Sequence, residues 1–301
     1  MWKKVTAPHF GAYKTRNMKI TVLTDNTPSS RFPQATAEHG LSLFIEYEGT
    51  SILCDTGLSS AFMENAAIMG IAVENADFIF LSHGHNDHSG GLKGFLQQHP
   101  DKPLFLHPDS LECRFFSTRR GCKRDISSDS DIATLHAGNI RYITKSTRIG
   151  KGITAVTGTC NAHSTPYGNI FLTKEKAGTE LADDFSHELA LAFESEKGLV
   201  IISPCSHRGA VNIIEDCILA TGCKEVYAFI GGLHFVESEH IEAETATFNK
   251  EISSRFPHTR IITGHCTCDK AKAILAETMA QVSFFATGDT ILIQQEPQQE
   301  I

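Results

Sequence analysis

Four potential metal ligands lie within six residues of one another, at His83, His85, Asp87 and His88. They directly follow the apolar run Phe78-Ile79-Phe80-Leu81, which is typical of a buried strand. Alternate side chains of an extended segment share a face, so His83 and His85 can point the same way, while a turn brings Asp87 and His88 round from the other side. Imidazoles and a carboxylate suit zinc, and also iron or manganese. The spacing therefore predicts a metal-dependent enzyme.

These four side chains could hold two ions, with His83 and His85 on one ion and Asp87 and His88 on the other. Neighbouring ions can share a hydroxide and stabilise both ends of a displacement reaction. The alternative is a histidine-rich surface loop that binds nothing, and only the surrounding structure separates the two interpretations.

Later apolar runs also end in histidine or cysteine. Cys205 and His207 follow residues 199–203, His234 follows residues 226–230, and His265 and Cys266 follow residues 260–263. In layered α/β proteins, reactive groups gather where strands end, so we expect these side chains to converge on one pocket. Each has a simpler alternative: the cysteines can be small buried hydrophobes, and His234 can have a packing role instead of contacting substrate.

Three further residues have weaker context. Glu188 could ligate a metal, orient a ligand histidine or be a charge at a strand edge. His163 and His187 lie in segments without a clear pattern, and we expect both to be solvated.

The elements that must position these groups alternate between strands and helices. Strands are predicted at 18–23, 78–81, 104–107, 226–230, 260–263 and 290–293, with hairpins at 41–54 and 189–203. Helices are predicted at 59–69, 91–98, 210–221, 239–256 and 269–279. This alternation favours α/β layers over an all-β sandwich.

Residues 110–139 are polar and poorly periodic, which predicts an insertion or lid-like loop, with an ordinary surface excursion equally consistent. No linker-like composition divides the chain. We therefore expect an N-terminal extension at 1–17, followed by one domain at 18–301.

Composition narrows the partners. The net charge is −8, and the densest basic cluster, Arg119-Arg120-Gly121-Cys122-Lys123-Arg124, is too short to follow a phosphate backbone, so nucleic acid is not expected. That cluster could meet a small anionic substrate, or it could be a solvated loop. No apolar segment fits a secretory signal or a membrane span, and nine scattered cysteines fit reduced thiols, so we expect a cytoplasmic protein with no membrane partner.

The chain resembles the metallo-β-lactamase-fold superfamily, because residues 83–88 are similar to the signature loop of that superfamily. Six segments resemble one branch of it, the 7,8-dihydropterin-6-yl-methyl-4-(β-D-ribofuranosyl)aminobenzene 5′-phosphate synthases. They are Glu38-His39-Gly40-Leu41-Ser42, Cys54-Asp55-Thr56-Gly57, residues 81–92, Cys205-Ser206-His207, Gly231-Gly232-Leu233-His234 and Gly264-His265-Cys266-Thr267. The resemblance spans about residues 18–293.

The resemblance implies an α+β fold, an αβ/βα four-layer sandwich, with the metal site at one edge of its two central sheets. It implies that His83 and His85 serve a first ion, and that Asp87, His88 and His265 serve a second. For the remaining ligand of the first ion, the resemblance points to the region of Cys205 and His207, and we prefer His207.

Two departures from the family pattern bear on this set. Pro204 and Cys205 stand where a bridging acid is expected, so occupancy by two ions is a hypothesis. His187 stands where the branch has an acid, which makes His187 either an additional ligand or a tolerated surface change. Cys205, Glu188 and His187 are thus the weaker candidate ligands.

These parts predict a hydrolase that acts on a small anionic metabolite, a phosphoester, ester or lactone, through a hydroxide generated on one or two zinc ions. Asp87 would hold a metal and orient the hydroxide, and His234 would touch the anionic part of the substrate. The first alternative is the transferase reaction of the synthase branch, and the second is a non-enzymatic metal or ligand sensor. The resemblance argues against a redox role, because iron-dependent relatives replace the second histidine of the signature with an acid, and this chain has His85.

Overall fold

The computed structural model describes residues 18–293, so the predicted extension at 1–17 lies outside the described residues. A first sheet has the strand order β18-β1-β2-β3-β4-β5-β8. Its strands are β1 (Met18–Thr24), β2 (Ser42–Tyr47), β3 (Thr50–Cys54), β4 (Phe78–Phe80), β5 (Leu104–Leu106), β8 (Ile140–Tyr142) and β18 (Thr290–Ile293). The hairpin between β2 and β3 lies within the predicted range 41–54 and turns at Glu48 and Gly49, both with positive φ.

A second seven-stranded sheet has the order β17-β16-β15-β14-β13-β10-β9. Its strands are β9 (Thr147–Gly150), β10 (Ile153–Thr157), β13 (Leu189–Ser195), β14 (Gly198–Ile202), β15 (Val226–Ile230), β16 (Arg260–Thr263) and β17 (Val282–Phe284). The strands β14 to β17 run parallel to one another, as do β3, β4, β5 and β8 in the first sheet. The short strand β17 is absent from the sequence prediction because its three residues, two of them exposed, show no periodicity.

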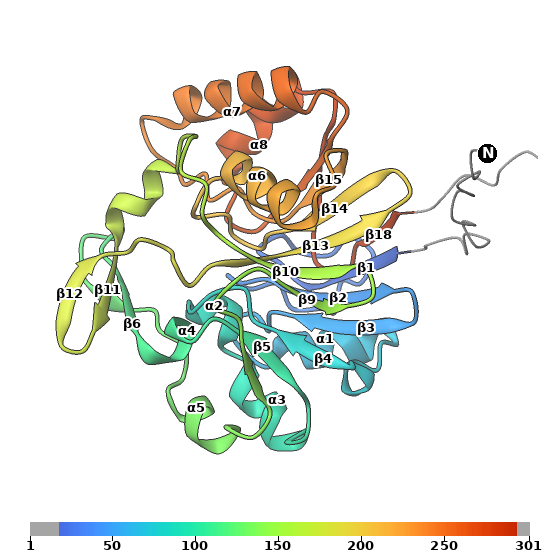
Figure 1. The fold of residues 1–301 in the computed structure, drawn as a ribbon, viewed down its shortest axis with the longest axis vertical. Coiled ribbons are helices and arrows are strands. Elements are labelled where there is room, and N and C mark those ends of the chain that lie inside the picture. Colours follow the sequence, from blue (N-terminus) through green and yellow to red (C-terminus); the bar gives the residue numbers. More distant parts are fainter. Residues whose placement is uncertain (1–17, 294–301) are drawn as a thin grey trace, which may run out of the picture.

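Helices cover the outer faces of both sheets (Figure 1). The helices of the described residues are α1 (Ala61–Met69), α2 (Asn86–Ser89), α3 (Leu92–Gln98), α4 (Asp109–Glu112), α5 (Asp131–Leu135), α6 (Ala210–Thr221), α7 (Ile241–Arg255) and α8 (Asp269–Thr278), with 3-10 turns at Val73–Asn75 and Tyr167–Phe171. One apolar cluster, including Ile45 and Phe193, lies between the sheets. A second packs α6, α7 and α8 on one sheet, and a third packs α1 and α3 on the other. The layers are therefore helix, sheet, sheet and helix, which confirms the predicted αβ/βα sandwich.

The segment 110–139 is not the irregular loop that its polarity predicts. It contains β6 (Arg114–Ser117) and β7 (Arg124–Asp125), which join β11 (Leu172–Lys176) and β12 (Thr179–Ala182) in a small third sheet, and it ends in α5. Phe115 and Phe116 on β6 are both buried, so this excursion has apolar anchors of its own. In Figure 1 the third sheet stands at one side of the sandwich, where β6, β11 and β12 are labelled.

The parallel strands determine where the site can form. The chain leaves the carboxyl ends of β3 and β4 at Asp55 and Leu81, and the carboxyl ends of β14, β15 and β16 precede Cys205, His234 and His265. Carboxyl ends of parallel strands meet at one edge of a sheet, so the two sheets together bring these segments to a common edge. Within residues 18–293, no helix has the length and apolar character needed to cross a membrane.

Candidate metal centre

The loop after β4 is held in a close-packed position. A Cβ at Gly84 would lie 2.4 Å from the Phe115 ring and 2.9 Å from the backbone of Ser110, so only glycine fits between the two flanking histidines. His85 has an extended backbone and α2 begins directly after it, which turns Asp87 and His88 away from the strand direction, as the spacing predicts. His83, His85 and His88 are all buried.

The first group of donors comprises His83, His85 and His207. The Nε2 atoms of His83 and His207 are 3.3 Å apart, and the His85 ring lies 4.6 and 4.8 Å from the His83 and His207 rings, centre to centre. Two nitrogens bound to one tetrahedral zinc ion at its usual bond length would lie about 3.3 Å apart. Nε2 of His85 is buried without a hydrogen-bond partner among the described residues, with Asp183 Oδ2 at 3.7 Å. The donors therefore fit a metal ion.

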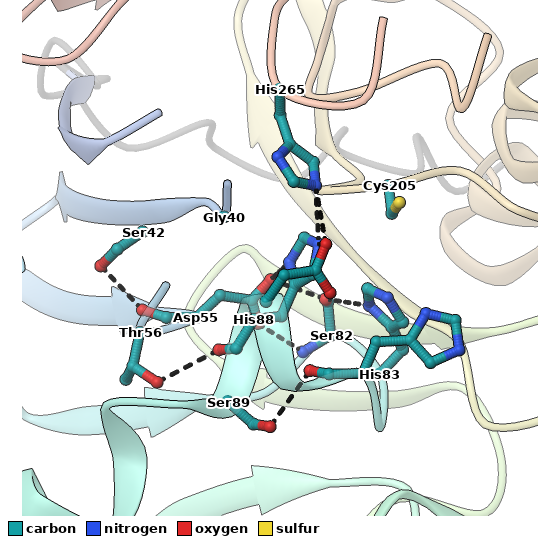
Figure 2. Close-up of polar contacts among 12 residues, drawn as sticks. Gly40, Ser42, Asp55, Thr56, Ser82, His83, His88, Ser89, Cys205 and His265 are labelled. Carbon is teal, nitrogen blue, oxygen red and sulfur yellow. Dashed lines mark hydrogen bonds and ion pairs between the residues drawn. The ribbon is translucent and has the colours of Figure 1, made fainter. Parts of the chain in front are cut away.

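The second group comprises Asp87, His88 and His265. The Nε2 atoms of His88 and His265 are 3.0 Å apart, and Asp87 Oδ2 lies 3.9 and 3.6 Å from them. Figure 2 shows His265 and His88 reaching toward each other. His265 follows β16 of the second sheet, whereas His88 lies in α2, which follows β4 of the first sheet. The sequence also predicts a catalytic role for Asp87, and its side chain lies here on the cleft described below.

Carboxylates and an amide fix which ring nitrogen each histidine presents. Asp55 Oδ2 is 2.6 Å from His88 Nδ1, so His88 presents Nε2 to the site. Asn26 Oδ1 is 3.0 Å from His265 Nδ1, and Asp25 Oδ1 accepts the backbone N–H of His265 at 2.7 Å. Such outer contacts orient ligand histidines and raise their basicity.

The electrostatics keep most of the imidazoles neutral. Burial, followed by the neighbouring histidines, holds the pKa values of His83 and His207 well below their usual range. Burial also lowers the pKa of His265 to about 3. For His88, burial disfavours the charged form, but Asp87 and Asp55 outweigh it and raise the pKa to about 9. Neutral imidazoles have the free lone pair that a metal needs, whereas a metal at His88 must displace a proton.

Cys205 lies between the two groups. Its Sγ belongs to one cluster with His83 and His207 and to another with His88 and His265, with all ligand atoms of each cluster within 4.8 Å of one another. It also contacts Cys266 Sγ at 3.3 Å and His234 Nδ1 at 3.6 Å. Burial raises the pKa of the Cys205 thiol well above its usual value. The position that lacks the expected acid thus holds a thiol within reach of both groups.

Glu188 and His187 are buried but are occupied elsewhere. The two carboxylate oxygens of Glu188 accept the backbone N–H groups of His207 and Arg208 at 2.8 and 2.9 Å, so Glu188 orients the segment that carries His207. His187 Nδ1 accepts the Gly84 N–H at 3.1 Å, and its Nε2 lies 3.2 Å from Asp183. The expectation that His187 is a solvated surface residue is therefore wrong, because this side chain supports the metal loop.

His163 is half-buried, with its Nδ1 2.8 Å from Glu251, and this contact corrects the expectation that it is solvated. Asp25, Asn26, Asp55 and Asp183 were not among the predicted site residues. Asp55 had a signal, since it follows β3 directly in Cys54-Asp55-Thr56-Gly57. The others are brought to the site only by contacts between segments distant in the chain.

The donors open on a cleft of about 540 Å³, within the range of small-molecule sites. Asp87, His207, His234 and His265 line it, together with residues of the third sheet. The ring of His234 is 4.1 Å from that of His207. His234 is thus placed beside the first group and on the cleft wall.

The chain is similar to known proteins in sequence and in fold. Residues 35–111 match the model of the metallo-beta-lactamase superfamily. The chain is 30% identical over 279 residues to the 7,8-dihydropterin-6-methyl-4-(beta-D-ribofuranosyl)-aminobenzene-5′-phosphate synthase of Methanocaldococcus jannaschii, covering 88% of this chain and 92% of that protein.

Solved structures agree on the fold. Tm1679, a metal-dependent hydrolase of the beta-lactamase superfamily, is 26% identical with a TM-score of 0.76, and the match covers 92% of this chain and all of that one. A diphosphatase of the PhnP family, at 12% identity and a TM-score of 0.53, shares the fold alone over 93% of this chain and 99% of that one.

Proposed function

Because this chain belongs to the metallo-β-lactamase superfamily, in the branch of the M. jannaschii synthase, we propose that it is a metal-dependent enzyme acting on a small anionic metabolite. The proposed reaction is hydrolysis of a phosphoester, ester or lactone. One observation carries the proposal: two pairs of buried imidazole nitrogens, 3.3 and 3.0 Å apart, face each other beside an open cleft.

We propose that His83, His85 and His207 hold one zinc ion and that Asp87, His88 and His265 hold a second. When bound, such ions lower the pKa of water and polarise a phosphoryl or carbonyl oxygen. The support for this ligand set is the donor geometry and the outer contacts of Asp55, Asn26 and Ser82, whose Oγ is 2.8 Å from His83 Nδ1.

The chain's own residues supply the remaining functions. Despite its burial, Asp87 has a pKa well below the usual range because of the neighbouring histidines, so its carboxylate stays ionised and can orient an attacking water. His234 lies on the cleft wall, where its ring can donate a hydrogen bond to the anionic end of a substrate. The cleft walls limit the substrate to a small molecule.

A second candidate function is that of a synthase, and it is supported at least as well by sequence similarity, since the 30% identical relative bears that name. In a synthase, the same site would stabilise a leaving group and not activate water. A sensor without catalysis is the remaining alternative, which the open cleft beside the donors disfavours.

The test combines metal analysis with a substrate screen. We expect protein purified without added metal to contain between one and two ions, and His83→Ala and His265→Ala to lose both metal and turnover. His258→Ala is the matched control, because His258 is exposed and does not line the cleft.

Phosphoesters, lactones, thioesters and the synthase substrates should be screened in parallel. Turnover of the synthase substrates alone would replace hydrolysis by synthesis. Full metal occupancy without any turnover would favour the sensor, and a metal content far below one ion would overturn the proposal.

A further inference from the structure

The cleft has a second chemical feature, three arginines that line it together with the histidines. We propose that Arg119, Arg120 and Arg124 form a binding site for the phosphate or diphosphate group of a phosphorylated metabolite. This inference rests on the proposed function, because it specifies which anionic substrate the same cleft accepts.

The three arginines line the same cleft as Asp87, His207 and His265. They come from the loop between β6 and β7 and from β7 itself, in the third sheet at the side of the sandwich. A ligand in the cleft can therefore contact the metal donors with one end and the arginines with another.

The charges of these arginines are not neutralised by neighbouring acids. Within residues 18–293, none of the three forms an ion pair, and Nε of Arg124 is buried without a hydrogen-bond partner there. The adjacent acids are bound to other cations. Asp125 pairs with Arg114 at 2.6 Å, and Glu180 pairs with Lys123.

Besides Asp125, which lines the cleft but is paired with Arg114, two further acids line it, Asp87 and Glu237. Asp87 belongs to the proposed metal ligands, and Glu237 is exposed. The β6–β7 hairpin thus lines the cleft with three unpaired positive charges, although the net charge of the whole chain is −8. An anion is the ligand that such a wall favours.

Backbone hydrogen bonds hold the arginine hairpin in register with the metal loop. The Asn86 N–H donates to the Ile126 carbonyl at 2.7 Å, and the Ser128 N–H donates to the Gly84 carbonyl at 3.0 Å. Arg124 stands two residues before Ile126, and Asn86 stands between His85 and Asp87. Because both sides belong to one hydrogen-bonded unit, the backbone at Arg124 keeps a fixed position relative to the loop that carries the histidines.

Guanidinium groups suit phosphate better than they suit a lactone or a neutral ester. Their planar N–H forks bind two phosphate oxygens at once, and such charge-assisted bonds are about twice as strong as neutral ones. Three guanidinium groups balance a diphosphate more closely than a phosphate monoester, whose charge is about −2 at pH 7. Among the substrate classes proposed above, this favours phosphorylated compounds.

The direct test measures binding of inorganic pyrophosphate and inorganic phosphate by calorimetry, using the full chain before and after removal of metal by a chelator. We expect metal-free protein to bind pyrophosphate, and Arg124→Gln to weaken that binding about tenfold. The triple change of Arg119, Arg120 and Arg124 to Gln should abolish it, and Arg124→Lys should recover only part of it.

Lys123→Gln and Arg141→Gln are the matched controls. Each removes one positive charge, but Lys123 is paired with Glu180 and neither lines the cleft. Equal weakening by Lys123→Gln and Arg124→Gln would reduce the effect to overall charge and overturn the site. Pyrophosphate binding by the triple variant at the affinity of the unaltered protein would do the same.

Turnover gives an independent arm. For a substrate with a phosphate group, Arg124→Gln should raise KM with metal content unchanged, and for an analogue without that group it should have no effect. If the metal proposal fails, His83→Ala retains full activity while the arginine variants still bind pyrophosphate more weakly. If only the arginine site fails, the histidine variants lose activity and the arginine variants bind pyrophosphate normally.

Discussion

Asp55→Asn is the change that tests the proposed metal centre most directly, because it replaces one carboxylate oxygen by an NH₂ group and changes almost no volume. Asp55 is buried, and its Oδ1 accepts the Ser82 backbone N–H at 2.8 Å. Its Oδ2 lies 2.7 Å from Ser82 Oγ and 2.6 Å from His88 Nδ1. An asparagine that keeps its oxygen on the Ser82 N–H must direct its NH₂ group at His88.

That NH₂ group can only donate, so His88 must accept at Nδ1 and carry its proton on Nε2. Nε2 is the atom that faces His265 at 3.0 Å and that the metal requires. Loss of such an outer contact typically weakens metal binding about 10- to 100-fold, and we expect the second ion of Asp55→Asn to be weakened by that factor. The metal-free protein should lose about 1–3 kcal/mol of unfolding free energy.

Chelator competition with zinc at a fixed pH measures the affinity, and ¹⁵N NMR of the histidine rings identifies the tautomer. Ser42→Ala is the matched control, since the Ser42 hydroxyl donates to the Asp55 carbonyl at 2.9 Å without touching His88. The Ser42→Ala variant should have a free energy of unfolding lower by about 1 kcal/mol and an unchanged zinc affinity. Zinc affinity equal to that of the unaltered protein in Asp55→Asn would refute the assignment of His88 as a ligand oriented by Asp55.

Three further predictions concern single side chains and pH. His234→Ala should lower kcat/KM by about 10- to 100-fold with metal content unchanged, and parallel loss of metal would make His234 a ligand instead of a substrate contact. Glu188→Gln should lower the melting temperature and the metal content together, because one of two backbone N–H groups at His207 and Arg208 then meets an NH₂ group; a variant with normal melting would contradict this role. Unfolding of metal-free protein should become easier below about pH 6.5: the folded His265, with a pKa of about 3, binds fewer protons than the unfolded one, which costs about 1.4 kcal/mol by about pH 5.5. His83 and His207, whose pKa values are also lowered, change the free energy of unfolding in the same direction. His88, with its pKa of about 9, has the opposite effect. Its contribution to stability is fully present below about pH 6.5 and is lost as the pH rises through about 9. Urea denaturation of the metal-free protein at three pH values, from below about 6.5 to above about 9, measures how these effects add up. A free energy of unfolding that is the same at all three pH values would contradict the prediction.

The sequence predicts best where local signals agree. The bounds of β15, α6 and β16 match the predicted ranges 226–230, 210–221 and 260–263, because apolar runs there are bounded by residues such as Gly222 and Gly264. The convergence of strand ends on one edge was also predictable, since it follows from parallel order in an α/β architecture.

Long-range partners were not predictable in this way. Asp25 and His265 are 240 residues apart in the chain, and no local pattern indicates that a carboxylate near β1 holds the backbone of His265. The same holds for the hydrogen bond between Asn86 and Ile126, which makes the polar segment 110–139 part of the site. Polarity alone predicted a loop there, because the two buried phenylalanines of β6 are too few to produce a periodic signal.

The missing bridging acid has a physical counterpart in Cys205. Its sulfur lies within 4.8 Å of the ligand nitrogens of both histidine pairs, the place from which one side chain can serve two ions. A thiolate there would favour softer metals such as zinc over manganese or magnesium. Because burial raises the pKa of this thiol, metal binding must release its proton, so the second ion should bind more tightly as the pH rises.

Cys205→Asp should therefore keep two ions but shift the preference toward manganese, and Cys205→Ala should lose one ion, as measured by metal analysis after dialysis against mixed metals. Cys217→Ala is the control, since Cys217 is also a buried thiol but packs in the apolar cluster at α6 and does not line the cleft. Two ions retained in Cys205→Ala, with the preference for zinc unchanged, would show that the histidines and Asp87 suffice. The thiol would then be a buried neighbour of the centre, and the site would need no bridging protein ligand at all.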